Sequence, residues 1–539
     1  MKKKLSIILM AVLLVAMTLA GCKSDEKSNA SNGDKSKAPE NFNETGYPIV
    51  NEAITLEMMG QRSPLQPDWG EMGFFKTMKE KTNMDFTYRV STSEQYQQQK
   101  QLAFASQQLP DLFFGALFNA AEEVDYGSQG FLQPLENLIE KYAPNLQKVM
   151  EKYPNLKPSI TAPDGHIYAL PGIDTSITSQ TPIAWMNGPW LEKIGAERPT
   201  TTEELYNLLK KFKETDMNGN GKDDEIPMTA SSIAELRYNI LPAFGIPYGT
   251  SGSLPGIYED NGTVKYAFMQ DGYKEYMKFL NRLYSEKLLD QQIVSHTWEQ
   301  YVAKGAANQI GVFPTWPIIM MGYADPAEGE NYPLLPALTS PINNKPITVK
   351  ITEIKRGRAA ITSANKHPEA TMRWLDYMYS EEGTILARLG IEGKNWEWTD
   401  DSKSSWTLLA PEGMNTTQAN AQDAPGAGTA VPMILEQEFF SKEENPTLRI
   451  IEQWILDEYY PHLTVPFPDV YFTLEEQETT NTLRPDIDKY IEQMEAKFVT
   501  GELSIDKEWD KYVSTLNKLG IEDIVKVNQA AYDRWAEAK

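Results

Sequence analysis

The stretch with the clearest potential for chemistry runs from Asp216 to Pro227 and reads Asp-Met-Asn-Gly-Asn-Gly-Lys-Asp-Asp-Glu-Ile-Pro. Acidic and amide side chains alternate with other residues, so a chain that curls around a cation can direct several oxygens inward, and Gly221 allows a sharp turn. An all-oxygen shell suits calcium better than zinc or copper. The predicted ligands are the side chains of Asp216, Asn218, Asn220, Asp224 and Glu225 and the backbone carbonyl of Lys222.

The twelfth position of this loop departs from a helix-loop-helix calcium site. Such a site has a bidentate Glu there, whereas this chain has Pro227. We therefore expect Asp224 and Glu225 to close the loop. The alternative interpretation is a surface turn rich in Asn and Asp that binds no metal.

The first residues resemble a bacterial lipoprotein signal. Three lysines follow Met1, an apolar run extends from Leu5 to Ala20, and Leu-Ala-Gly-Cys occupies residues 19–22. We expect cleavage after residue 21, lipidation of the Cys22 sulfur (for example with palmitate) and a lipid-anchored protein on the extracellular face of a bacterial cell membrane, of Gram-positive type. The alternative is an ordinary signal peptide or an N-terminal anchor with an incidental cysteine.

Composition limits the partners of this chain. Its formal net charge of −24 argues against binding to nucleic acid and against electrostatic docking on anionic lipid. Membrane contact is therefore expected through the lipid alone. Cys22 is the sole cysteine, so no internal disulfide forms. The 12 Trp and 26 Tyr favour a sugar-binding cleft, in which aromatic rings stack on pyranose faces, although most of these rings are expected in the core.

The mature chain begins with a β-α-β pattern. Apolar runs at residues 54–60 and 84–90 flank a helical stretch at 74–81, and a third buried strand covers 109–115. Strands of this kind form a mostly parallel sheet whose carboxyl ends face a crevice. We expect ligand contacts at that edge.

Several phrases resemble family 1 extracellular solute-binding proteins, the lipoprotein receptors of carbohydrate ABC importers. These are Leu-Pro-Asp-Leu-Phe-Phe at 109–114, Asp-Gly-His-Ile-Tyr-Ala-Leu-Pro at 164–171, Trp-Leu-Glu-Lys-Ile-Gly at 190–195 and the loop at 216–227. The similarity spans residues 50–539 and is greatest to the calcium-containing chains that bind alginate and other oligosaccharides. It implies an α/β fold of the periplasmic-binding-protein-like type II, with two lobes joined by crossover strands and a ligand cleft between them. In the alginate-binding members a loop like this one holds calcium.

The resemblance also implies a division of the chain. The predicted segments are a signal peptide (1–21), the lipidated cysteine with a disordered tether (22–45), the first part of lobe one (46–180), the first part of lobe two with the calcium loop (181–350), the return to lobe one (351–420) and a mostly helical C-terminal part, chiefly in lobe two (421–539). A structural calcium on lobe two would then lie away from the cleft.

Polar and aromatic residues near the predicted crossovers and strand ends are the candidate ligand contacts. Arg62 has a guanidinium fork that suits the carboxylate of a uronic acid, and Trp316 lies in a loop after a strand. Each Trp has packing in the core as its alternative role. The predicted ligand-binding residues are Gln61, Arg62, Trp185, Asn187, Trp316, Glu392, Trp396 and Trp398.

We expect a receptor and not an enzyme. The histidines, His166, His296, His367 and His462, are not paired at metal-ligand spacing, and the chain has neither a nucleophile elbow nor a phosphate-binding glycine loop. The predicted protein captures an oligosaccharide, closes its lobes around it and delivers it, as a monomer, to the permease subunits of an ABC importer. The alternatives are an oligopeptide receptor and a glycan-cleaving surface lipoprotein. The sequence does not identify the sugar.

Overall fold

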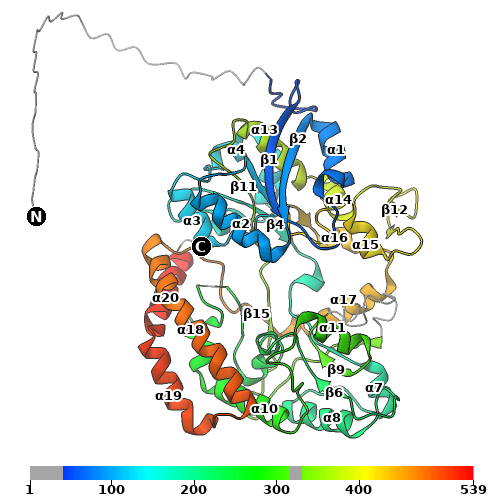
Figure 1. Cartoon of the computed structure of the whole chain (residues 1–539), viewed down its shortest axis with the longest axis vertical. Coiled ribbons are helices and arrows are strands. Elements are labelled where there is room, and N and C mark those ends of the chain that lie inside the picture. Colours follow the sequence, from blue (N-terminus) through cyan, green and yellow to red (C-terminus); the bar gives the residue numbers. More distant parts are fainter. Residues whose placement is uncertain (1–40, 252, 316–330, 538–539) are drawn as a thin grey trace, which may run out of the picture. The chain divides into compact units, whose positions relative to one another are not determined.

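Two sheets organise the structure, a computed structural model that describes residues 41–251, 253–315 and 331–537 (Figure 1). The larger sheet has six strands, and we call it, with the helices packed on it, lobe one. The smaller sheet has three strands, and we call it, with its helices, lobe two. The predicted α/β fold is therefore confirmed.

The sheet of lobe one is mixed. β1 lies parallel to β2 and β3, and β14 lies parallel to β4, whereas β11 runs antiparallel to its neighbours β3 and β4. The first residues of β11 therefore lie at the carboxyl ends of β3 and β4. In spatial order the strands are β14 (Ile434–Leu435), β4 (Leu170–Asp174), β11 (Ile354–Ile361), β3 (Leu112–Phe114), β1 (Ile54–Gln61) and β2 (Met84–Ser91).

Helices with apolar faces cover this sheet. The first of them connects β1 to β2, so the β-α-β unit predicted from the sequence is present, and it buries Phe74, Phe75 and Met78. A hairpin of β12 (Trp396–Trp398) and β13 (Trp406–Leu408) extends lobe one. The helices are α1 (Gly73–Thr82), α2 (Ser93–Ala105), α3 (Ala120–Ser128), α4 (Glu136–Tyr142), α5 (Pro144–Lys152), α6 (Leu156–Ile160), α13 (Pro368–Asp376), α14 (Glu381–Leu389) and α15 (Thr416–Ala421).

Lobe two contains the larger described core. Its sheet has the order β5-β9-β6, in which β9 is antiparallel to β5 and parallel to β6. The C-terminal helices α18 (Leu474–Thr500), α19 (Ile505–Lys518) and α20 (Ile521–Glu537) pack with α10 (Asp271–Ser285) around this core. The remaining elements are β5 (Trp185–Met186), α7 (Gly188–Lys193), α8 (Thr202–Glu214), β6 (Ile226–Met228), α9 (Ile233–Leu236), β7 (Ile257–Asp260), β8 (Thr263–Tyr266), α11 (Trp298–Ala306) and β9 (Ile310–Phe313).

The chain passes between the lobes three times. The first crossover joins β4 to β5, and the second joins β9 to β11 through β10 (Thr348–Val349). The third joins β14 to α18 and includes α16 (Gln437–Phe440), α17 (Pro446–Glu458) and β15 (Leu463–Thr464). β10 and β15 pair in parallel, so the second and third crossovers run side by side. The two lobes are therefore linked by adjacent strands.

The lobe boundaries given above remain a prediction, but two observations bear on them. β14 belongs to the sheet of lobe one, although it lies in the segment 421–539 that we expected chiefly in lobe two. Residues 41–45, expected in the tether, are part of the folded body: Phe42 pairs with Val50 and contacts Tyr142, and Arg373 donates a hydrogen bond to the carbonyl of Asn43. Apolar Phe42 favours burial over the solvated state of a tether. Cys22 and the signal lie outside the described residues.

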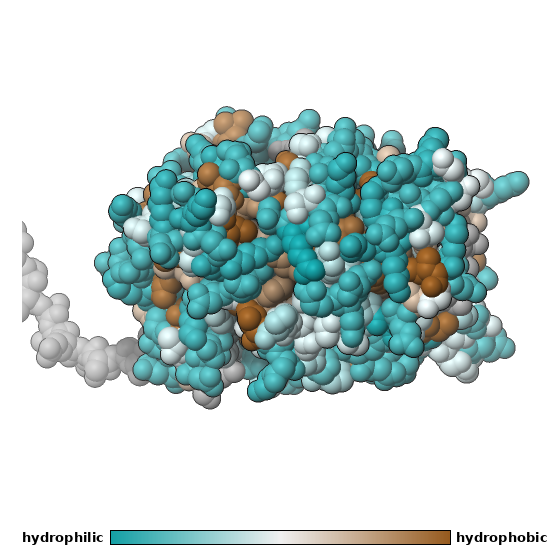
Figure 2. All heavy atoms as spheres, turned by 90° about the horizontal axis from the view of Figure 1, so that it is seen from below, coloured by the Kyte–Doolittle hydropathy of each residue, from teal (hydrophilic) through white to brown (hydrophobic). Residues whose placement is uncertain are grey.

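The face shown in Figure 2 is mainly hydrophilic, with hydrophobic residues in small separate patches. Among the described residues no helix has the length and apolar character needed to cross a membrane.

Candidate functional site

The predicted calcium loop forms a series of tight turns between α8 and β6. The carboxylate of Asp216 accepts hydrogen bonds from the backbone N–H groups of Gly219 and Gly221, at 2.8 and 3.0 Å. The side-chain oxygens of Asn218 and Asn220 accept from the N–H groups two residues further on, at 3.1 and 2.8 Å, the second being that of Lys222. The alternation read from the sequence thus produces a curled loop.

Asp224 is the centre of this loop. Its carboxylate accepts hydrogen bonds from the side-chain amides of Asn218, Asn220 and Gln309, at 3.0–3.1 Å, and these donors lower its pKa. Gln309 precedes β9 and was not predicted, because it is distant from the loop in the sequence. The structure therefore brings together the side chains of Asn218, Asn220 and Asp224, whereas the Asp216 carboxylate contacts the backbone of the same loop.

Glu225 points elsewhere. It is 5% exposed, and its Oε1 accepts the N–H of Met217 at 2.8 Å. Among the described residues no group of three His, Cys, Asp or Glu side chains gathers as a metal site would require. The loop does offer a set of hard oxygen donors, because rotation of the Asn218 and Asn220 amides would turn oxygen instead of nitrogen toward Asp224.

The predicted ligand contacts of lobe two are buried. Trp185 is completely buried in a cluster between β5, β9 and α17. Asn187 is 2% exposed; its Oδ1 caps α7 at Trp190, and its Nδ2 donates to Asn308 Oδ1 at 3.0 Å. Both side chains thus hold lobe two together in this structure. Trp316 lies outside the described residues.

The predicted contacts of lobe one fall in two places. Gln61 ends β1, and Arg62 follows it, with its Nη1 donating to the Gln66 carbonyl at 2.8 Å and its Nη2 3.8 Å from an Asp68 oxygen. In the β12–β13 hairpin Trp396 is 3% exposed, and Trp398 is half-buried against it with ring centroids 5.2 Å apart; Glu392, which precedes the hairpin, is exposed. The seven predicted residues that the structure describes therefore do not form one site.

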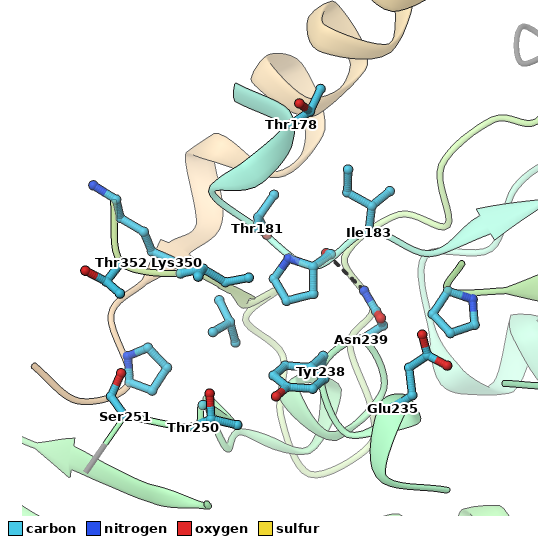
Figure 3. Close-up of a pocket in the computed structure, with 16 residues that line it drawn as sticks. Thr178, Thr181, Ile183, Glu235, Tyr238, Asn239, Thr250, Ser251, Lys350 and Thr352 are labelled. Carbon is cyan, nitrogen blue, oxygen red and sulfur yellow. Dashed lines mark hydrogen bonds between the residues drawn. The ribbon is translucent and has the colours of Figure 1, made fainter. Parts of the chain in front are cut away.

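A cavity of about 350 Å³ lies where the crossovers meet lobe two (Figure 3). Thr178, Thr181 and Ile183 reach it from the first crossover, Lys350 and Thr352 from the second, and Pro466 from the third. Its lobe-two wall includes Glu235, Tyr238, Asn239, Thr250 and Ser251. A second cavity of about 440 Å³ shares Thr250, Ser251 and Thr352 with the first. Of the predicted ligand-binding residues, seven are described by the structure, and none of them lines either cavity.

Tyr238 is the aromatic side chain of the first cavity. Its ring meets that of Tyr248 edge-on with centroids 5.0 Å apart, and burial raises the pKa of its hydroxyl. Asn239 beside it donates from Nδ2 to the carbonyl of Pro182 at 3.1 Å, which ties lobe two to the first crossover (Figure 3). The Glu235 carboxylate accepts the N–H of Ser231 at 2.8 Å. An aromatic ring among hydroxyl, amide and carboxylate groups is the combination that a sugar needs.

The sequence carried no pattern that identifies this cavity. Residues 235–239 form a short helix and its end, without alternation or motif, and they meet the crossovers only in the folded chain. The predicted boundary between lobe one (46–180) and lobe two (181–350) was the one useful signal, because Thr181 and Ile183, just after it, line the cavity.

Comparisons with known proteins agree with this architecture. The family model of bacterial extracellular solute-binding proteins matches residues 61–385. The fructooligosaccharide ABC transporter substrate-binding protein FusA of Streptococcus pneumoniae is 30% identical over 552 residues, with 98% of each chain covered. Lipoprotein LipO of Bacillus subtilis is 24% identical, with 72% of this chain and 74% of LipO covered.

Solved structures of FusA are similar along nearly the whole chain. FusA in complex with kestose has a TM-score of 0.78 and 28% identity, and the match covers 90% of this chain and 100% of that chain. A FusA EF-hand mutant in complex with fructo-nystose has a TM-score of 0.77 and 27% identity, with the same coverage. The family resemblance inferred from the sequence is confirmed, and the chain belongs to the bacterial extracellular solute-binding proteins.

Proposed function

We propose that this protein is the substrate-binding component of a carbohydrate ABC importer and that it captures an oligosaccharide between its lobes. The observation that carries this proposal is the cavity of Figure 3, which has residues of all three crossovers on its wall. A ligand there touches the segments that must move when the lobes open and close, so it favours the closed form by its differential affinity. The 30% identity to fructooligosaccharide-binding FusA over 98% of the chain supports a sugar over a peptide as the ligand.

Within the cavity, Tyr238 is the proposed platform for a sugar ring, with Asn239, Glu235 and the threonine hydroxyls as hydrogen-bonding partners. Gln61 and Arg62, at the carboxyl end of β1, remain candidates for contacts on lobe one, together with Trp398 and Glu392. Trp185, Asn187 and Trp396 are assigned packing roles on the basis of their burial. Trp316 remains a candidate from the sequence.

Replacing Tyr238 by alanine tests this assignment. We expect the affinity for the cognate oligosaccharide to fall at least tenfold, about 1.4 kcal/mol, because the stacking surface is lost. Isothermal titration measures this. Tyr284→Ala, at a half-buried tyrosine of α10 outside both cavities, is the matched control and should bind like the wild type. Equal affinities of the two variants would place the sugar elsewhere.

A receptor and an enzyme differ in what they release. We infer that the protein has no catalytic activity, because its family consists of solute-binding proteins. A labelled oligosaccharide incubated with the protein should be recovered intact. Shortened products would instead favour a glycan-cleaving lipoprotein.

We also propose that Cys22 carries a lipid and anchors the protein, as a monomer, outside the cell next to the permease subunits. The signal-like residues 1–22 support this, as does the relative LipO, which is named a lipoprotein.

The loop at 216–225 is the proposed site of a structural calcium ion. Its oxygen donors support this, and so does the relationship to FusA, a protein with an EF-hand. The FusA EF-hand mutant was obtained in complex with fructo-nystose, which favours separate calcium and sugar sites.

Removing calcium should therefore lower stability and leave sugar binding nearly unchanged. Calcium at a hundredfold over its dissociation constant would stabilise the folded protein by about 2.7 kcal/mol. A chelator would abolish this stabilisation. Thermal unfolding with and without chelator measures this loss. Asp216→Ala should remove the response, whereas Asp223→Ala, at a carboxylate that pairs with Lys213 outside the proposed ligand set, should retain it. Loss of sugar affinity without a change in melting temperature would contradict separate sites.

A further inference from the structure

The start of β11 places three cationic side chains at the carboxyl edge of the lobe-one sheet. Lys355, Arg356 and Arg358 lie within four residues, where β11 leaves the second crossover. In open α/β sheets this edge is where ligands bind. A cation that already has partners within the protein is less available to a ligand than one that has none.

Two of them have partners within the protein. Lys355 Nζ donates to the carbonyl of Thr352 at 2.6 Å. Arg356 Nη2 donates to the carbonyl of Ser159 at 2.5 Å, and its guanidinium lies 4.0 Å from the centre of the Tyr471 ring. Lys355 therefore bonds within the crossover, and Arg356 connects the crossover to α6 and to Tyr471.

Arg358 differs from both. Its side chain makes no hydrogen bond, ion pair or cation–π contact with any of the residues that the structure describes, although it is only half exposed. Burial lowers the pKa of Arg358 to about 10, and no neighbouring acid offsets this. A partly desolvated guanidinium without acceptors is unfavourable, since it stays charged and its donors are incompletely solvated.

The backbone fixes the direction of this side chain. The register of β11 against β4 shifts between Lys355 and Ala359, so the strand bulges there, and bulges re-aim side chains beside functional sites. The N–H of Ala116 donates to the Arg358 carbonyl at 3.0 Å, and that of Phe118 to the Gly357 carbonyl at 3.0 Å. Gly357 has φ +70°, and a Cβ there would lie 2.0 Å from the Phe118 carbonyl oxygen, so only glycine fits.

Arg358 lines neither of the two cavities, but a chain of contacts connects it to Thr352 on their walls. Its charge contributes to lowering the pKa of Lys355, after the larger effect of burial, so the two cations are neighbours. Lys355 is hydrogen-bonded to Thr352, and Thr352 lines both cavities. On the other side, the Cγ of Arg358 passes β4 at Gly172, where a Cβ would lie 3.5 Å from it.

We propose that Arg358 is a specificity-determining residue whose guanidinium binds two oxygens of one sugar residue in the captured oligosaccharide. The planar fork of a guanidinium matches a pair of acceptors, supplied either by a carboxylate or by adjacent hydroxyls. The ligand then provides the acceptors that the described residues do not supply. This inference rests on the proposed function as an oligosaccharide receptor.

The test compares Arg358→Met, which removes the charge and keeps the stem, with Arg89→Met. Arg89 on β2 is also half-buried, but it donates to the Gln108 carbonyl at 3.2 Å and lies 3.6 Å from a Glu57 oxygen. Titrations with kestose and with trigalacturonate measure affinity, and thermal unfolding of the sugar-free proteins measures stability. We expect Arg358→Met to lose at least tenfold in affinity with an unchanged or higher melting temperature. Arg89→Met should bind normally and melt earlier.

The two sugars distinguish the sources of the oxygens. A loss confined to trigalacturonate and reduced by salt identifies a carboxylate, whereas a loss with kestose that salt does not change identifies hydroxyls. Arg358→Lys should not restore binding, because an ammonium lacks the fork. Wild-type affinity in Arg358→Met, or a melting temperature that falls as in Arg89→Met, overturns this inference and leaves the proposed function intact. A wild type that binds neither sugar overturns it together with the proposed function.

Discussion

Replacing Glu495 by alanine is expected to lower the free energy of unfolding by about 3–5 kcal/mol, because it leaves a buried arginine without its counter-ion. Glu495 is 3% exposed and lies on α18, and its carboxylate pairs with the guanidinium of Arg237, which ends α9. Arg237 Nε donates to Oε1 at 3.0 Å, and the Tyr273 hydroxyl donates to the same oxygen at 2.5 Å. Urea unfolding measures the loss. Sugar affinity should fall too, since Arg237 precedes Tyr238 in the chain.

Two further variants test whether the unpaired buried charge of Arg237 causes this loss of stability. Glu502→Ala breaks an exposed pair with Lys497 on the same lobe, and it should leave the unfolding midpoint nearly unchanged. Combining Arg237→Leu with Glu495→Leu removes both charges and should recover much of the stability, because no unpaired charge remains. A double variant as unstable as the sum of its single variants would contradict the account.

A second large effect is expected on changing the pH, through Glu123 on α3. This carboxyl is 1% exposed; its Oε2 accepts from the Tyr471 hydroxyl at 2.9 Å, and its Oε1 has no partner among the described residues. Burial raises its pKa to about 7, against the opposing effects of Arg356 and the Tyr471 hydrogen bond, and nearby Glu122 adds to the rise. Tyr471 belongs to the third crossover, so this contact joins lobe one to the segment that leads into lobe two.

The direction of this pH dependence follows from the protons that Glu123 binds in the folded and in the unfolded chain. Between pH 4.5, the ordinary pKa, and pH 7 the unfolded chain loses the Glu123 proton while the folded chain keeps it. The free energy of unfolding therefore falls as the pH rises, by about 3 kcal/mol in total from this group, and changes no further above pH 7.

Glu123→Gln removes this titration. We expect the wild type to lose about 3 kcal/mol relative to the variant between pH 4.5 and 7.5, as measured by urea unfolding at each pH. Burial also raises the pKa of Asp376 to about 6, but that contribution is common to both proteins and cancels in the difference. Glu80→Gln, at an exposed position of α1, is the control. Identical pH profiles of wild type and Glu123→Gln would contradict a buried, protonated Glu123.

The elements that the sequence predicted well are those with a local signal. The opening β-α-β unit follows from the apolar periods at residues 54–91, and the curl of the calcium loop follows from Asn and Asp side chains that bond to the backbone two or more residues on. Both depend on neighbours in the chain. The family phrases then added the two-lobed fold, which no local pattern contains.

The cavity could not be predicted in the same way. Trp185 and Trp396 were predicted as aromatic ligand contacts, yet both are buried in cores, because periodicity does not distinguish a ring that packs from one that faces a ligand. Tyr238 becomes a candidate only when the fold brings residues 178–183, 235–251 and 349–352 together. Arg358 is distinguished by its surroundings, because its lack of partners among the described residues is visible only in three dimensions.

The most direct test of the central claim is a calorimetric titration of the purified protein, with calcium present, against kestose, trigalacturonate and a mixture of short peptides. We predict saturable binding of one of the two sugars and no binding of the peptides, with the sugar recovered intact. Binding of peptides without binding of either sugar would contradict the account and assign the protein to the oligopeptide receptors.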